Sequence, residues 1–246
     1  MRMKFISQVK MSVIIPSFFC IAWMSITPAW ALSLDALRYV FTGDKDSISV
    51  IVSNEAKRTF GGQVWVDNIV ESDTRPTFVV TPSFFKLKSE KKQVLRVIKA
   101  VNLPQDKESV YWLNLQEIPP LMEGSGLSVA VRTRVKLFYR PAALLKGRKQ
   151  AEEKMLLLAS PDGKSLSLKN TTPYIFAINS LLNDEGVALS IPKEATNKLL
   201  MFMPGDEVTV PDTVSQVVSV NDFGELKKHA LVRPASVDAQ VSSLEQ

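Results

Sequence analysis

One long segment, Leu127 to Pro141, alternates between apolar and polar residues and restricts the fold more than any other feature. The positions on its apolar side are Leu127, Val129, Val131, Thr133, Val135 and Leu137. A period of two predicts a β-strand with one apolar face. The segment continues for about eleven residues, whereas strands usually have roughly five or six. Pro141 ends it, because proline cannot donate to a strand ladder.

The polar side of this segment leaves two interpretations open. Arg132, Arg134 and Lys136 would protect an ordinary edge strand from pairing with other molecules. Alternatively, the long apolar edge is kept so that another chain can pair with it by strand addition. The alternation alone does not decide between them.

The first residues have the three parts of a secretory signal peptide. Three basic residues without an acid precede an apolar run from Met11 to Trp23, and Ala29-Trp30-Ala31 supplies a small-x-small cleavage site. We therefore expect residues 1–31 to be removed after Ala31. An uncleaved anchor is the minor alternative, because the apolar run is short for a membrane span.

Removal of this segment changes what the composition implies. The mature chain would have no cysteine, since Cys20 is lost, and its formal charge would fall from +5 to +2. The remaining basic residues are dispersed, so nucleic acid is not an expected partner. We expect an exported protein that is held together by packing without disulfides and is not stably inserted in a membrane.

Short alternating segments separated by turns predict an all-β fold with two domains. In the first half the expected strands are Ser33 to Phe41, Ser47 to Ser53, Gly61 to Val66, Phe78 to Thr81, Gln93 to Lys99, Ser109 to Glu117 and the opening segment. Seven strands at this spacing are typical of an immunoglobulin-like sandwich. The charged stretch Pro141 to Lys154 predicts a domain connection, which places the domains at residues 32–145 and 150–246.

The second domain is expected to be smaller and also all-β. Its predicted strands are Ser165 to Lys169, Tyr174 to Asn179, Leu200 to Phe202, Val208 to Val210, Gln216 to Val220 and a segment at Leu231. A polar stretch from Asn183 to Lys198 separates them.

The sequence contains little that could support catalysis. A single histidine, His229, and no mature cysteine exclude the usual metal clusters and Cys/His nucleophiles. No glycine-rich phosphate loop occurs. The carboxylate pair Glu152-Glu153 is most simply a pair of solvated charges. We expect no cofactor, no metal and no enzymatic activity.

Several longer motifs together resemble one family, the periplasmic pilus chaperones of the chaperone-usher pathway. They are LPQDKES (103–109), WLNLQEIPP (112–120), VKLFYRPA (135–142), NTTPY (170–174) and VNDFG (220–224). The resemblance covers essentially the whole mature chain. It implies two immunoglobulin-like domains in a boomerang arrangement and a location in the periplasm.

The resemblance also implies a function. Members of the family bind pilus subunits by donor-strand complementation, in which the chaperone lends a strand to an incomplete subunit sandwich, and they deliver the subunits to an outer-membrane usher. Leu127, Val129 and Val131 match the donor residues. The short connection Pro120 to Leu127 and the absence of a disulfide resemble the short-loop branch of the family.

Two groups of charged residues match the family's binding and interdomain sites. Arg38 and Lys136 match the pair that binds the terminal carboxylate of the subunit, and Glu108, Arg140 and Asp222 match an interdomain ion network. From the residues alone, Arg38 could equally be a surface position, and the three network residues could be unrelated charges. Leu37 stands where many members of the family carry threonine, and its side chain lacks the hydroxyl that would make a supporting hydrogen bond there.

Two other classes of function also fit an exported all-β chain. A secreted pilus subunit or adhesin would also be exported and all-β, but we would expect an incomplete domain, a cysteine pair and an N-terminal donor extension, for which Leu32 to Phe41 is too short. A secreted sandwich enzyme or sugar-binding protein would need a polar or aromatic cluster in its loops, and none is evident.

Overall fold

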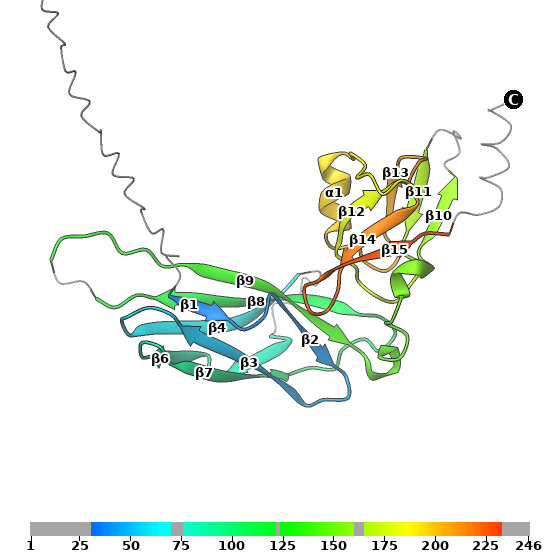
Figure 1. Ribbon diagram of the computed structural model, residues 1–246. Helices are drawn as coiled ribbons and strands as arrows, with labels where there is room; N and C mark the ends of the chain where they lie inside the picture. Colours follow the sequence, from blue (N-terminus) through cyan, green and yellow to red (C-terminus); the bar gives the residue numbers. More distant parts are fainter. Residues whose placement is uncertain (1–30, 70–75, 122–123, 160–164, 233–246) are drawn as a thin grey trace, which may run out of the picture.

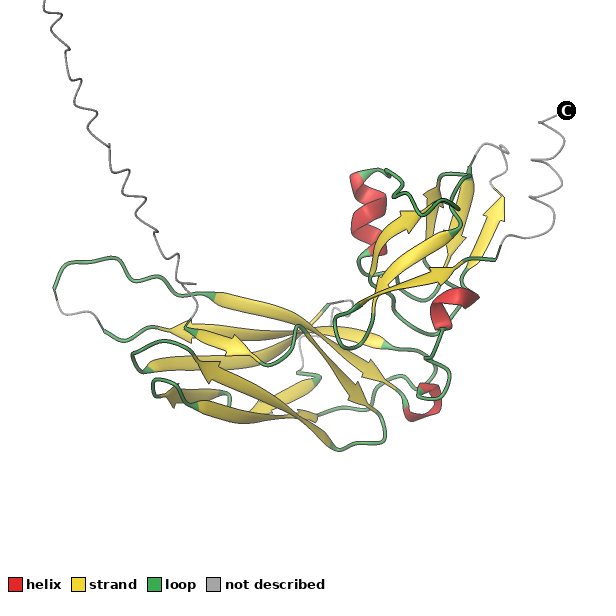
Figure 2. Cartoon of the chain, viewed as in Figure 1, coloured by secondary structure: helices red, strands yellow, loops and turns green. Residues whose placement is uncertain are grey.

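The computed structural model describes residues 31–69, 76–121, 124–159 and 165–232. These residues form two β-sandwiches that meet at an angle, so the molecule has the shape of a boomerang (Figure 1). Helical structure in the described residues is limited to α1 (Lys193–Leu199) and two 3-10 turns, Ala142–Leu144 and Ala151–Lys154 (Figure 2). The expected all-β fold with two immunoglobulin-like domains is confirmed.

The first sandwich consists of a four-stranded and a five-stranded sheet. The four-stranded sheet has the order β1 (Leu32–Leu34), β3 (Ser47–Asn54), β7 (Lys92–Lys99) and β5 (Phe78–Thr81). The five-stranded sheet has the order β2 (Arg38–Thr42), β9 (Arg132–Arg140), β8 (Ser109–Ile118), β4 (Phe60–Asn68) and β6 (Phe84–Leu87). All neighbours are antiparallel except β2 and β9, which are parallel.

The core of this sandwich is built from the inward side of each alternating strand. Phe41, Val50, Leu95, Leu113 and Leu137 are fully buried between the two sheets. Such burial contributes roughly 1.5–3 kcal/mol for each large apolar side chain. The alternation that predicted the strands therefore also identifies the residues that hold the sheets together.

The segment Ser33 to Phe41 differs from the prediction of a single strand. It forms two strands in different sheets, because β1 pairs with β3 and β2 pairs with β9. At the crossover, the Asp35 carboxylate accepts hydrogen bonds from the Ile51 N–H (2.9 Å) and the Tyr39 hydroxyl (2.6 Å). A pattern of apolar residues reports which side chains are buried, but not which sheet a strand joins. The short strand β6 was not predicted.

The second sandwich consists of two three-stranded sheets. One contains β10 (Leu156–Ala159), β11 (Leu166–Lys169) and β13 (Glu207–Val210), and the other contains β12 (Ile178–Leu182), β14 (Gln216–Val220) and β15 (Leu226–Ala230). Predictions were less accurate here. The predicted strand Tyr174 to Asn179 overlaps β12 only at residues 178–179, and the strand expected at Leu231 lies just after the end of β15. The predicted strand Leu200 to Phe202 is only an isolated bridge between Phe176 and Phe202. The polar stretch 183–198 contains most of α1, and β10 was missed.

The connection between the domains contains a buried ion pair. Arg148 forms a bidentate ion pair with Glu152, with both N–O distances at 2.9 Å, and the Ser219 hydroxyl also donates to Glu152. Glu152 is only 2% exposed, so its interpretation as a solvated charge was wrong, whereas Glu153 is exposed as expected. Arg148 and Glu152 are four residues apart, a spacing that brings two side chains together on one helical turn.

The predicted signal peptide lies outside the described residues except for Ala31, so its limits remain a prediction. Within the part of the chain that is described, no helix is long and apolar enough to cross a membrane.

Candidate functional site

The parallel pairing of β2 with β9 places Arg38 opposite Lys136. Both side chains extend from the first domain toward the second. The Lys136 ammonium donates to the Leu200 carbonyl oxygen at 2.6 Å, and Nη1 of Arg38 donates to the Val220 carbonyl oxygen at 2.9 Å. We call Arg38 and Lys136 the cation pair. It lies between the two domains.

Two cations are held close together here, and the charge of Asp222 acts on Arg38 without forming an ion pair with it. None of the ion pairs formed among the described residues includes Arg38 or Lys136. Burial lowers the pKa of Lys136, and the charge of Arg38 lowers it further. Burial also lowers the pKa of Arg38. An ammonium has three N–H donors and a guanidinium has five, so most donors remain able to bind an anion such as a carboxylate.

Residues 127–131, which we call the donor segment, do not continue strand β9 as predicted. The strand begins at Arg132, and the donor segment forms no regular structure. The reason lies in the adjacent strand. Strand β8 ends at Ile118 and is followed by two prolines, which cannot donate hydrogen bonds to a strand ladder. At the last residue of the donor segment, the Val131 carbonyl oxygen still accepts hydrogen bonds from β8. The donors are the Glu117 N–H (2.9 Å) and the Gln116 side chain (3.2 Å).

The donor segment exposes large apolar side chains. Leu127 is 86% exposed and Val129 is 65% exposed, whereas Val131 is half-buried. Figure 1 shows this part of the chain extending beyond the first sandwich, in line with β9. An extended apolar segment that lacks strand partners can readily pair with another chain.

The edge of β9 next to the donor segment is also open. Strand β2 begins at Arg38, opposite Lys136, so residues 132–135 are paired with β8 on one side and with none of the described strands on the other. An added strand along this edge would therefore lie in line with β2. It would end at the cation pair.

The three residues of the predicted interdomain ion network are in contact. Nε of Arg140 donates to Glu108 at 2.5 Å, and its two terminal nitrogens donate to the two oxygens of Asp222 at 2.7 and 2.9 Å. The second oxygen of Glu108 accepts the Ile175 N–H at 2.8 Å. Glu108 and Arg140 belong to the first domain, whereas Asp222 and Ile175 belong to the second. The network therefore joins the domains.

The two carboxyl groups of the network differ in their titration. Burial raises the pKa of Glu108, despite the opposing charge of Arg140. Burial would also raise the pKa of Asp222, but its hydrogen bonds with Arg140 and the charge of Arg140 hold that pKa below its ordinary value. Arg140 is thus the cation on which both acids depend.

Replacing Arg140 by methionine is expected to destabilise the protein by about 3–5 kcal/mol, because Glu108, only 2% exposed, would be left as a buried charge without a contacting cation. Urea unfolding measures this change. Arg134→Met is the matched control, since Arg134 is exposed on the same strand and forms no ion pair among the described residues. Equal unfolding midpoints for the two variants would contradict the assigned importance of the network.

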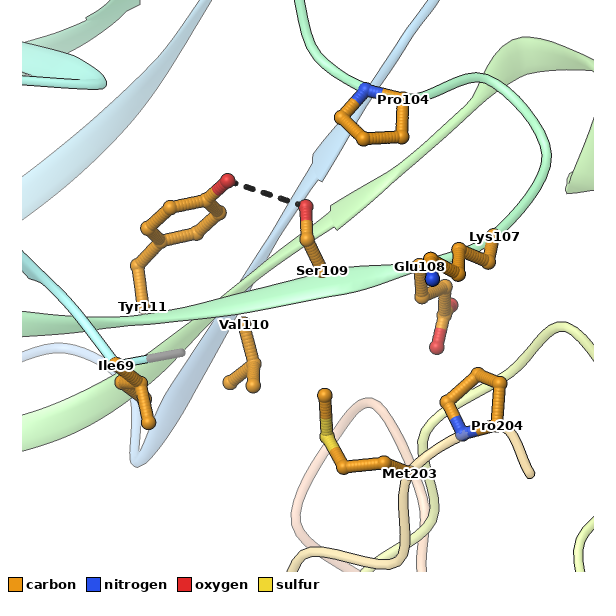
Figure 3. A pocket seen from close by; sticks show the side chains of 9 residues that line it. All are labelled: Ile69, Pro104, Lys107, Glu108, Ser109, Val110, Tyr111, Met203 and Pro204. Carbon is orange, nitrogen blue, oxygen red and sulfur yellow. Dashed lines mark hydrogen bonds between the residues drawn. The ribbon is translucent and has the colours of Figure 1, made fainter. Parts of the chain in front are cut away.

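A cavity of about 420 Å³ adjoins the network and was not predicted (Figure 3). Ile69, Val110 and Met203 form its apolar side, and Glu108 lines its other end. Its lining comes from both domains and from segments far apart in the sequence, which is why no local pattern indicated it. Among the described residues, no group of three or more His, Cys, Asp or Glu could hold a metal ion.

Comparison with known proteins agrees with this geometry. Residues 31–145 match the family described as the pili and flagellar-assembly chaperone, PapD N-terminal domain. The chaperone protein FaeE of Escherichia coli is 59% identical over 213 residues, which cover 85% of this chain and 82% of FaeE. The chaperone protein ClpE of Escherichia coli is 62% identical over 199 residues, which cover 80% of this chain and 75% of ClpE.

A solved structure extends the agreement to the fold. The E. coli chaperone DraB is 27% identical and superimposes with a TM-score of 0.65, covering 81% of this chain and 95% of DraB. The chain therefore belongs to the family of pili and flagellar-assembly chaperones.

Proposed function

We propose that this chain is a periplasmic chaperone that binds pilus subunits by donor-strand complementation and delivers them to an outer-membrane usher. The observation that carries the proposal is the open edge of β9, which continues into an exposed apolar donor segment at one end and meets the cation pair at the other. An incomplete subunit sandwich exposes an apolar groove and unpaired strand edges, and this chain supplies the complement of both.

The direction of the bound subunit strand follows from these positions. Its terminal carboxylate lies at Arg38 and Lys136, and its preceding residues extend along β9 toward Leu127. The subunit's last strand and β9 are therefore parallel, as β2 and β9 already are. Side chains at alternate positions of the donor segment, Leu127, Val129 and Val131, enter the subunit groove while their backbone groups pair with the subunit edges.

The cation pair fixes the register of this strand pairing. A carboxylate accepts from both an arginine and a lysine at once, and each charge-assisted hydrogen bond contributes about 1.5–3 kcal/mol. A shift of one residue would turn every donor side chain away from the groove. Anchoring the chain end at Arg38 and Lys136 prevents that shift.

The interdomain ion network keeps the cation pair in place. Arg38 and Lys136 reach carbonyl groups of the second domain, so their positions depend on the angle between the domains. Glu108, Arg140 and Asp222 hold that angle through short, charged hydrogen bonds. In this proposal residues 1–31 are removed on export, residues 32–145 carry the donor strand and residues 150–246 complete the cleft, without any enzymatic step.

Expression of the tagged chain in the periplasm together with a candidate pilus operon tests the proposal. A stable one-to-one complex with a pilus subunit is expected on purification, with mass spectrometry identifying the partner. The matched control is the same chain with Leu127, Val129 and Val131 all replaced by serine, which is expected to yield folded chaperone without subunit. Incorporation of the parent chain into surface fibres would instead favour the alternative of a pilus subunit or adhesin.

A further inference from the structure

Glu117 is a buried acid for which the proposed function has no use. It lies near the end of β8, on the same side as Tyr111, Leu113 and Leu115, and is only 4% exposed. Its Oε1 accepts backbone hydrogen bonds from Ala31 N–H at 2.9 Å and from Leu32 N–H at 2.8 Å. The side chain therefore reaches from the five-stranded sheet to Ala31 and to the first residue of β1 in the opposite sheet.

This carboxylate lacks a cationic partner. No basic side chain in the described part of the chain forms an ion pair with Glu117. Two amide donors satisfy one oxygen but supply no full positive charge. A buried carboxylate without a countercharge is costly, and proteins usually pair such a group.

The predicted processing of the chain would create a cation at this place. Cleavage after Ala31 converts the backbone nitrogen of Leu32, the atom 2.8 Å from Oε1, into an α-ammonium group. We propose that Glu117 is the binding site for the N-terminal ammonium of the mature chain. The proposal depends on the predicted cleavage site and is independent of subunit binding.

The hydrogen bonds lost on cleavage can be replaced. The N–H of Ala31 no longer reaches Glu117, but an ammonium has three donors and can use a second one on the same carboxylate. The Ala31 carbonyl also accepts from Glu55 N–H at 2.8 Å, and Glu55 is exposed, so water takes over that bond. Cleavage therefore adds an ion pair without leaving a buried polar group unsatisfied.

The ion pair would fasten the shortest strand of the first sandwich. β1 has three residues and lies at the edge of its sheet, paired with β3 alone. Glu117 would hold its first residue to the opposite sheet. The backbone N–H of Glu117 also donates to the Val131 carbonyl, so the chain end is fixed beside the last residue of the donor segment, where β9 begins.

A cycle of four proteins tests this assignment. Glu117→Gln is made in the mature chain beginning at Leu32 and in a chain that retains Ala29-Trp30-Ala31 before Leu32. Glutamine keeps an oxygen acceptor but removes the charge. We expect a lower urea midpoint for the substitution in the mature chain, and an unchanged or higher midpoint in the extended chain, where only amide groups meet residue 117. Glu55→Gln, which removes an exposed acid near the same chain end, should shift neither midpoint.

A chemical measurement on the folded proteins gives a second readout. Because acylation requires the neutral amine, loss of the ion pair should increase the labelling rate of the Leu32 amino group at pH 7 by about tenfold for each unit by which its pKa falls. Equal effects of Glu117→Gln in the mature and extended chains would show that Glu117 only accepts amide hydrogens, and would overturn the proposal. A purified mature chain that begins at any residue other than Leu32, determined by mass spectrometry, would also overturn it.

Discussion

Replacing Val129 by glutamate is expected to abolish capture of pilus subunits while leaving the free chaperone folded. Val129 is 65% exposed in the free protein, so a carboxylate at this position remains in water. In the proposed complex the same side chain enters an apolar groove. Burial of an unpaired charge there costs several kcal/mol, which corresponds to a loss of affinity of at least about 10³-fold.

Co-purification from the periplasm measures this loss, and circular dichroism verifies the fold. Ala130→Glu provides the matched control, because residue 130 belongs to the same exposed segment but alternates to the opposite side. It adds the same charge and should retain the subunit. A normal yield of subunit with Val129→Glu would remove Val129 from the groove and with it the proposed donor strand.

Lys136→Met and Arg38→Ala are each expected to prevent subunit capture. Either change removes half of the cation pair and leaves the subunit carboxylate undercompensated between the domains, where burial already lowers the pKa of both cations. Folding should survive, because each residue gives up one hydrogen bond to a carbonyl of the second domain, worth about 1 kcal/mol. Removing one cation also relieves the repulsion that it exerts on the other.

Arg134→Met is the control for the loss of charge. Arg134 lies two residues before Lys136 on the same face of β9, but it is exposed and its guanidinium stacks on Trp112 at 4.6 Å. Its removal should leave subunit capture intact. If Lys136→Met and Arg134→Met captured subunits equally well, the cation pair would be no more than surface charge that keeps an edge strand from aggregating.

The sequence predicted those parts of the fold that depend on local pattern. Alternation located β5 and β14 to the residue and located β3, β7, β8, β11 and β13 within one or two residues at each end. It failed where the decisive information was a partner elsewhere in the chain. Ser33 to Phe41 divides between two sheets, and the donor segment lacks the neighbour that would make it a strand.

The site residues also divide into those that a local pattern could predict and those that depend on partners elsewhere in the chain. From the residues alone Glu108, Arg140 and Asp222 were three separate charges, and only the family resemblance suggested that they meet. Their contacts depend on how two domains pack, which no local period encodes. The Arg148–Glu152 pair could have been found from its spacing of four residues, whereas the contacts of Glu117 with Leu32 and Ala31 join positions 85 and 86 apart.

Affinity measurements on a thermodynamic cycle test the central claim most directly. The parent chaperone and Lys136→Met are each titrated with an intact pilus subunit and with one that lacks its final residues. We predict that truncation weakens binding to the parent but causes little further loss with Lys136→Met, because both changes delete the same contact. Losses that add in full would show that Lys136 and the subunit terminus do not meet, and would contradict the account of how this chaperone holds its subunits.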